Sequence, residues 1–212
     1  MTQKKMKKFL VIGNPIDHSL SPKLHNYWIK KNKIDATYDK KLLNKGDIDS
    51  IILKVKNEEI TGVNVTVPFK KTVISFLDEL TIEAKESQSV NTIYKKNNRI
   101  VGHNTDIAGF ELGLRHFKYN VSGKKVFILG AGGVVSSIIL ALKRMGASKI
   151  ILTNRTKQKA YDMKKSFSGI EIIDWGKIPE FDMIINATSV GLKKKDEFEL
   201  NYTGSGSNKF FY

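Results

Sequence analysis

The sequence predicts an α/β fold made of two α/β domains, and two observations support this class. Near the middle of the chain, residues 125–129 contain four consecutive apolar residues, which fit a buried strand, and continue through a glycine turn into an apolar helical segment. In the first hundred residues, short apolar runs also alternate with segments of helical spacing. We expect a first domain over residues 1–104, with a mainly parallel sheet, and a second over residues 105–212.

The N-terminal elements begin with a strand at residues 9–12, which a turn connects to a helix start. We interpret Ser21 as the N-cap of this helix and Pro22 as its first helical residue. Ser19 has no such structural role, and a junction between a strand and a helix is where open α/β sheets place ligands. The alternative is that Ser21 only caps the helix.

The following segments predict an edge strand at residues 36–41, a helix at 47–56 and a strand at 62–67. In the last strand, alternation places Asn64 and Thr66 on the face opposite the valines. Pro68 ends this strand, and we expect it to open a helix that carries Val73, Ile74 and Leu77. Lys70 would then lie in the first turn of that helix, close to Asn64 and Thr66. An exposed lysine without a role is the alternative.

Two strand-like runs, residues 89–94 and 99–103, flank Asn97 and Asn98, which predicts a hairpin. A cluster of capping residues at 104–106 then predicts the start of a helix, which we interpret as the connector between the two domains.

The glycine turn after residues 125–129 predicts a nucleotide site. Five residues form it: Gly130, Ala131, Gly132, Gly133 and Val134. Glycine lets the backbone turn sharply and brings a pyrophosphate close to the N–H groups of the helix start. The pattern Gly-x-Gly-x-x-Gly is met in part, because Val135 occupies its third glycine position. We therefore expect the second domain to be Rossmann-like.

The segment after the next strand, residues 149–153, indicates NADP as the cofactor. NAD enzymes place an acidic residue near the end of this strand, whereas this chain continues with Asn154, Arg155, Thr156 and, three residues on, Lys159. A guanidinium group matches a 2′-phosphate in charge and geometry. The alternative is a helix N-terminus with solvated cations. Later in the chain, Thr188 and Ser189 follow a predicted strand at 182–186 and are expected to line the cofactor cleft.

The composition excludes several classes of protein. The chain has 212 residues, of which 41% are hydrophobic and 27% charged, as in ordinary globular proteins. It has no apolar run of membrane-spanning length and no cysteine, so we expect no membrane partner, no disulfide and a cytoplasmic location. The lysines behind the net charge of +15 are scattered, so we expect no nucleic-acid partner. The four histidines lack the spacing of metal ligands, and no metal site is predicted.

Seven motifs in order resemble the shikimate dehydrogenase family, the enzymes of aromatic amino acid biosynthesis that reduce 3-dehydroshikimate with NADPH. They occupy residues 18–22 with His25 and Asn26, and then 64–70, 89–92, 102–106, 130–133, 154–156 and 186–191. The resemblance implies an oxidoreductase with a small-molecule substrate, active as a monomer or a homodimer. The family pattern continues past Tyr212 with a further strand, a tyrosine-containing loop, a glutamine that contacts substrate and packing helices, so we expect the C-terminal end to be truncated.

The resemblance also implies roles for individual residues. Five short polar side chains would bind the carboxylate and hydroxyls of the substrate: Ser19, Ser21, Asn64, Thr66 and Asn91. Lys70 and Asp106 would form the catalytic pair. Hydride delivery to a ketone leaves an alkoxide that a lysine ammonium can protonate, and an aspartate beside it can orient the ammonium.

Two other functions remain open at this stage. The chain also resembles the quinate/shikimate dehydrogenases, which accept a broader range of hydroxy acids. Such relatives tend to favour NAD, and Arg155 argues against NAD as the cofactor here. A non-catalytic NADP-binding regulator is the other alternative, and the presence of both Lys70 and Asp106 argues against it.

Overall fold

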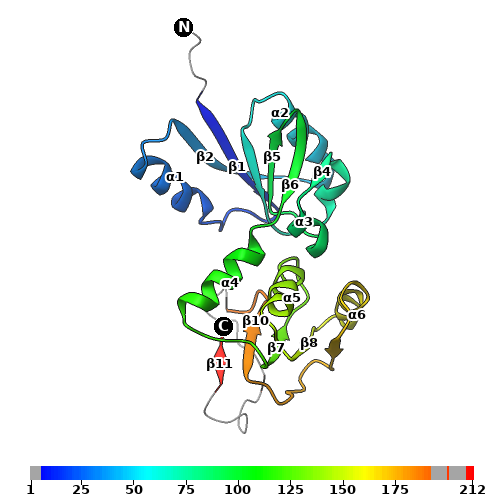
Figure 1. Ribbon diagram of the computed structural model, residues 1–212. Coiled ribbons are helices and arrows are strands. Elements are labelled where there is room, and N and C mark those ends of the chain that lie inside the picture. Colours follow the sequence, from blue (N-terminus) through cyan, green and yellow to red (C-terminus); the bar gives the residue numbers. More distant parts are fainter. Residues whose placement is uncertain (1–5, 192–199, 201–208) are drawn as a thin grey trace. The chain divides into compact units, whose positions relative to one another are not determined.

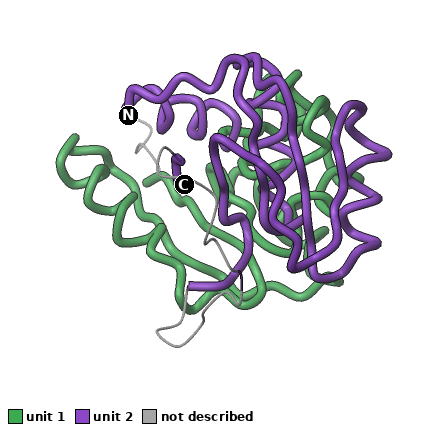
Figure 2. The backbone as a smooth tube through the Cα atoms, turned by 90° about the horizontal axis from the view of Figure 1, so that it is seen from below, with its two compact units in different colours: residues 1–105 green, residues 106–212 purple. Residues whose placement is uncertain are grey.

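A computed structural model describes residues 6–191, Leu200 and residues 209–212 of the chain. The chain divides into two compact units, Met1–Thr105 and Asp106–Tyr212, which are coloured separately in Figure 2. This division falls one residue after the expected domain boundary. Each unit has a β-sheet with its own hydrophobic core, so the predicted α/β class is confirmed. Among the described residues, no helix is both long enough and apolar enough to cross a membrane.

The sheet of the first unit has six strands in the order β2-β1-β3-β5-β6-β4 (Figure 1). The strands are β1 (Lys7–Gly13), β2 (Ala36–Leu42), β3 (Gly62–Val65), β4 (Glu79–Leu80), β5 (Thr92–Lys96) and β6 (Arg99–His103). All pairings are parallel except those of β5 with β3 and β6, so the sheet is mainly parallel as predicted. The predicted hairpin is β5–β6, and Asn97 and Asn98 at its tip have φ values of 49° and 60°, as a tight type I′ turn requires.

The helices of this unit cover both faces of the sheet. They are α1 (Ser21–Lys31), α2 (Ile48–Lys56) and α3 (Ile82–Ser87), with short 3₁₀ helices at η1 (Lys45–Asp47) and η2 (Thr72–Phe76). Neighbouring residues of β1 point to opposite faces of the sheet. Ile12 packs in the core formed with α2 and α3, whereas Val11 packs with Tyr38 of β2 and Ile29 of α1. The α1 face is the one on which the candidate site is built.

Two local predictions for this unit are wrong. Ser21 does not cap α1, because its backbone is already helical and Leu20 is the cap residue, without a side-chain cap bond. Instead, the Ser21 N–H donates to Ser19 Oγ at 3.3 Å.

The second error concerns the segment after Pro68. Here the chain makes turns and the 3₁₀ helix η2 rather than an α-helix, and Lys70 lies in a turn before η2 instead of in a first helical turn. The β-branched run at residues 72–74 disfavours an α-helix, and the chain must enter β4 only three residues after η2 ends. Val67, predicted to share a strand face with Val63 and Val65, is 56% exposed because β3 ends at Val65.

The sheet of the second unit is parallel throughout, with strand order β11-β10-β7-β8-β9. The strands are β7 (Lys125–Leu129), β8 (Lys149–Thr153), β9 (Ile170–Ile172), β10 (Met183–Asn186) and β11 (Phe210–Phe211). Three helices, α4 (Asp106–His116), α5 (Val135–Arg144) and α6 (Lys157–Ser166), pack on the face that carries Val126 and Ile128. The strand order runs in opposite directions on the two sides of β7, so its carboxyl end is the switch point where α/β sheets bind ligands.

Candidate substrate and cofactor sites

In the first unit, polar side chains predicted to bind substrate meet at the carboxyl end of β3. Asn64 pairs across the strands with Thr92, the first residue of β5. Its Nδ2 donates to Asn91 O at 3.2 Å and to Thr92 Oγ1 at 3.1 Å. Because β5 runs antiparallel to β3, the start of one strand lies beside the end of the other, and this brings together residues far apart in the sequence.

Both polar atoms of the Asn91 side-chain amide are hydrogen-bonded to Thr105, the last residue of this unit. Asn91 Nδ2 donates to Thr105 Oγ1 at 2.8 Å, and the Thr105 N–H donates to Asn91 Oδ1 at 3.0 Å. Asn91 is 9% exposed, so its amide needs such partners. We call this pair of bonds the Asn91–Thr105 clasp.

Of the two predicted catalytic residues, Lys70 has its backbone next to Asn91. The Lys70 carbonyl accepts a hydrogen bond of 2.8 Å from the N–H of Val90, the residue before Asn91. Asp106 directly follows Thr105 in the chain and is the first residue of α4. The clasp therefore holds Thr105, the last residue of the first unit, beside Asn91, which β3 and the Lys70 turn also approach.

The remaining predicted substrate residues, Ser19, Ser21 and Thr66, are half-buried. The Thr66 N–H donates to Ile12 O at 2.9 Å, which sets it beside the end of β1. A Cβ atom on Gly13 would come within 2.5 Å of Thr66 Cγ2, so only glycine permits this close approach. Gly13 was not among the residues predicted from the sequence.

Sequence reasoning also missed Tyr38, although it is the one buried residue of β2. Its hydroxyl donates to Asn64 Oδ1 at 2.7 Å. Burial raises the pKa of this hydroxyl to about 12, and a hydrogen bond with the Ser21 side chain opposes part of the rise. The sequence signal that could have identified it is a single aromatic residue in a predicted edge strand that continues with charged residues.

In the second unit, the glycine turn lies where β7, β8 and β10 end. Gly130 has a φ of 105°, and a Cβ atom there would lie 2.8 Å from Ala187 O. Its N–H donates to Thr153 O at 2.8 Å. Gly132 is exposed, with Ala187 O 3.8 Å from the position of a Cβ atom. Gly130 thus makes the sharp bend after β7 and bonds to the end of β8. Gly132 has no side chain to cover the exposed backbone, so a ligand can approach it.

Asn154 ties the glycine turn to the loop after β8. Its Oδ1 accepts from the Ala131 N–H at 3.0 Å, and its Nδ2 donates to Thr156 O at 2.8 Å. Arg155 and Lys159 are exposed, and α6 begins at Lys157. Both sequence interpretations of this segment therefore describe real features: it is a helix start, and it is a basic loop beside the glycine turn.

The loop after β10 is also ordered by side-chain contacts. Asn186 Oδ1 accepts from the Thr188 N–H at 3.0 Å and from Thr188 Oγ1 at 2.8 Å, while Ser189 is exposed. The open backbone at Gly132, the exposed guanidinium of Arg155 and this polar loop fit a dinucleotide with a 2′-phosphate.

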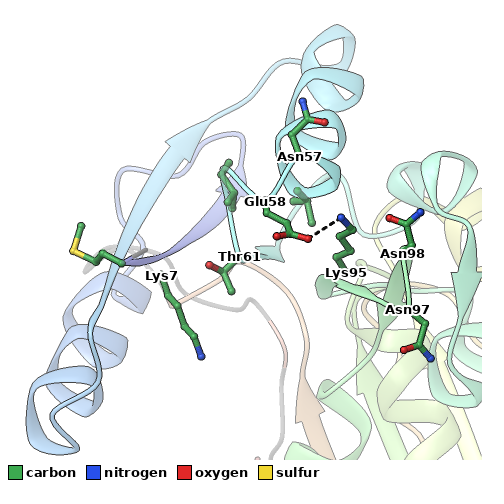
Figure 3. Close-up of a pocket in the computed structure, with 10 residues that line it drawn as sticks. Lys7, Asn57, Glu58, Thr61, Lys95, Asn97 and Asn98 are labelled. Carbon is green, nitrogen blue, oxygen red and sulfur yellow. Dashed lines mark hydrogen bonds and ion pairs between the residues drawn. The ribbon is translucent and has the colours of Figure 1, made fainter. Parts of the chain in front are cut away.

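A hollow of about 490 Å³ lies at the opposite, amino edge of the first unit (Figure 3). It is lined by Lys7 at the start of β1, Thr61 just before β3 and the hairpin tip, among others. Near its centre, Lys95 Nζ pairs with Glu58 at 2.8 Å. Open α/β sheets bind ligands at the carboxyl ends of their strands, so the candidate substrate site is the polar cluster around Asn91 and not this hollow.

Two family models match the chain. Residues 11–93 match the substrate-binding domain of shikimate dehydrogenase, and residues 111–194 match shikimate/quinate 5-dehydrogenase. Each match falls within one structural unit.

Individual relatives agree with these models. The chain is 62% identical to the NADP(+) shikimate dehydrogenase of Pelagibacter ubique over 97% of its own length and 78% of the relative's. It is 38% identical to that of Maridesulfovibrio salexigens, covering 92% of this chain and 71% of the other.

Solved structures agree as well. The crystal structure of shikimate dehydrogenase from Aquifex aeolicus has a TM-score of 0.84 at 35% identity, covering 96% of this chain and 76% of the other. The Thermus thermophilus enzyme in complex with NADP(H) and shikimate has a TM-score of 0.83 at 30% identity, covering 92% and 74%. With this identity and coverage, the chain belongs to the shikimate dehydrogenase family.

Proposed function

We propose that this chain is an NADP-dependent shikimate dehydrogenase, which reversibly reduces 3-dehydroshikimate to shikimate. The relative from Pelagibacter ubique carries that name at 62% identity. The observation that supports the proposal is the group of hydrogen bonds at Asn91, which joins this residue to Asn64 and, through the clasp, to Thr105.

In this proposal, residues 1–104 form the substrate-binding and catalytic domain, which carries Lys70, and residues 105–212 form the NADP-binding domain, whose first helix carries Asp106. Substrate would be held by five short polar side chains, which suit a small acid with several hydroxyl groups. They are Ser19, Ser21, Asn64, Thr66 and Asn91.

The proposed chemistry rests on Lys70 and Asp106. When bound, NADPH supplies the hydride that reduces the substrate ketone. Lys70 Nζ donates a proton to the resulting alkoxide oxygen and takes it back in the reverse direction. The Asp106 carboxylate orients the Lys70 ammonium and accepts a hydrogen bond from a substrate hydroxyl.

The cofactor would be held by the glycine turn and the two loops beside it. The backbone N–H groups at the start of α5 would receive the pyrophosphate, and Arg155 with Lys159 would receive the 2′-phosphate. The full set comprises Gly130, Ala131, Gly132, Gly133, Val134, Asn154, Arg155, Thr156, Lys159, Thr188 and Ser189. The proposal also includes a cytoplasmic location. It further includes a monomeric or homodimeric state, and light scattering after gel filtration measures the molar mass that distinguishes the two.

An absorbance assay of NADPH formation from shikimate and NADP tests the proposed activity. We expect turnover with this substrate pair, and much less when NAD replaces NADP or quinate replaces shikimate. Equal rates with quinate would favour the broader-specificity enzyme. NADP binding without turnover on either substrate would instead support the non-catalytic regulator.

A further inference from the structure

Tyr38 is held in place by two neighbouring residues of α1, although its strand lies at the edge of the sheet. Its ring stacks on the His25 ring, with centroids 4.1 Å apart and planes 10° from parallel. Asn26 brackets its backbone: Asn26 Nδ2 donates to Tyr38 O at 2.7 Å, and the Tyr38 N–H donates to Asn26 Oδ1 at 3.1 Å. The position of the phenol is therefore fixed from both its ring and its main chain.

The Tyr38 hydroxyl begins a continuous series of hydrogen bonds that ends at Thr105. It donates to Asn64 Oδ1, and Asn64 Nδ2 donates to Thr92 Oγ1. Thr92 Oγ1 in turn donates to Asn91 Oδ1 at 3.0 Å, where the Thr105 N–H also donates. Since Asn64 Oδ1 faces a hydroxyl donor, the Asn64 amide is oriented with its N–H groups towards β5.

Burial raises the pKa of the same phenol, and the Ser21 side chain on α1 opposes part of this effect. Tyr38 is 3% exposed, so little of it reaches solvent or a ligand directly. With a pKa near 12, its hydroxyl stays protonated in neutral solution and remains a donor. A residue so placed acts on a ligand through Asn64, the side chain to which its hydroxyl donates.

We propose that Tyr38 is a positioning residue for the substrate site, which orients the Asn64 amide for binding. The inference rests on the proposed function, since Asn64 is a substrate residue within it. It also accounts for His25 and Asn26, two motif residues that otherwise have no role in the site.

Tyr38→Phe tests this inference, because it removes the hydroxyl and keeps the ring on His25. We expect the KM for shikimate to rise about threefold to tenfold, the effect of one neutral hydrogen bond, while the KM for NADP stays unchanged. Tyr94→Phe is the matched control: Tyr94 is half-buried in the same sheet but pairs with Gly62 at the amino end of β3. It should leave both constants unchanged.

A double mutant separates positioning from a general effect on the fold. If Tyr38 acts through Asn64, adding Tyr38→Phe to Asn64→Ala should raise the KM for shikimate by clearly less than it does in the wild-type chain. The same full increase in both backgrounds would overturn a role through Asn64.

The side-chain amide of Asn64 provides a readout that does not depend on turnover. Its NMR signals should shift in Tyr38→Phe and stay in place in Tyr94→Phe. Unchanged Asn64 signals together with an unchanged KM for shikimate would refute the inference while leaving the proposed function intact. A wild-type chain that neither binds nor oxidises shikimate would remove the proposed function and this inference with it.

Discussion

Asn91 shows how single residues organise the candidate substrate site. Its backbone carbonyl accepts from Asn64 Nδ2 and from the Val65 N–H, and its side chain bonds to Thr105. With main chain and side chain both engaged, the amide has one orientation. The hydrogen bonds within the first unit therefore preform the site around Asn91, which is itself one of the predicted substrate residues.

Lys70→Ala is expected to lower kcat by about 10²–10⁴-fold, the usual contribution of general acid–base catalysis. Shikimate affinity and the thermal unfolding temperature should change little, because Lys70 contacts Val90 through its backbone carbonyl, which alanine retains. Steady-state kinetics and calorimetry measure these effects. Lys71→Ala, at the exposed next residue, is the control and should keep normal turnover. Lys70→Ala with normal kcat would exclude Lys70 as the proton donor.

Arg155→Ala is expected to weaken NADPH binding by about 1.5–3 kcal/mol, the range for hydrogen bonds to charged groups, and to leave NADH binding nearly unchanged. Lys157→Ala is the matched control, because Lys157 Nζ already pairs with Asp174 at 2.6 Å. Binding constants for both cofactors provide the measurement. Equal losses for NADPH and NADH would mean that the 2′-phosphate is bound elsewhere.

At the scale of elements, local patterns predicted regular structure better than irregular structure. Strands β7 and β8 were predicted because each contains a short apolar run, and helix α5 because its apolar residues continue to a natural stop at Gly146. The segment after Pro68 was mispredicted because a tight path into β4, which is a tertiary constraint, decides its conformation. Tyr38 was missed for a similar reason: its partner Asn64 lies 26 residues away in the sequence.

Alanine substitutions of two glycines in the turn after β7 are expected to have different effects, one on stability and the other on NADP binding. Gly130→Ala should lower the thermal unfolding temperature, because its φ of 105° is unfavourable for other residues and the new Cβ would press on Ala187 O. Gly132→Ala should leave that temperature nearly unchanged, since its Cβ meets only an ordinary contact, and should weaken NADP binding. Calorimetry with NADP titration compares them. Similar destabilisation by both would contradict this division of roles.

At the scale of the whole molecule, the two units have separate cores. The buried clusters of the first unit contain no residue after Ile100, and those of the second contain none before Ile107. Each unit therefore buries its own apolar surface, which is the main source of stability in a folded domain.

Separate cores predict two thermal transitions that respond to different ligands. Shikimate should raise the temperature of one and NADP that of the other, each by the amount that binding stabilises its unit, about 2.7 kcal/mol at a ligand concentration of 100 times Kd. Differential scanning calorimetry with each ligand alone tests this. A single transition that both ligands shift equally would show that the units unfold together.

The Asn91–Thr105 clasp has a practical consequence for engineering the chain. The β5–β6 hairpin lies between Asn91 and Thr105, so the hydrogen bonds of the clasp fix its two ends to each other. Its tip, Asn97 and Asn98, is exposed and lies at the amino edge, away from the polar cluster. Exposed polar turns are the positions where insertions are best tolerated. The tip is thus a natural place to graft a reporter peptide or an affinity tag without disturbing substrate binding.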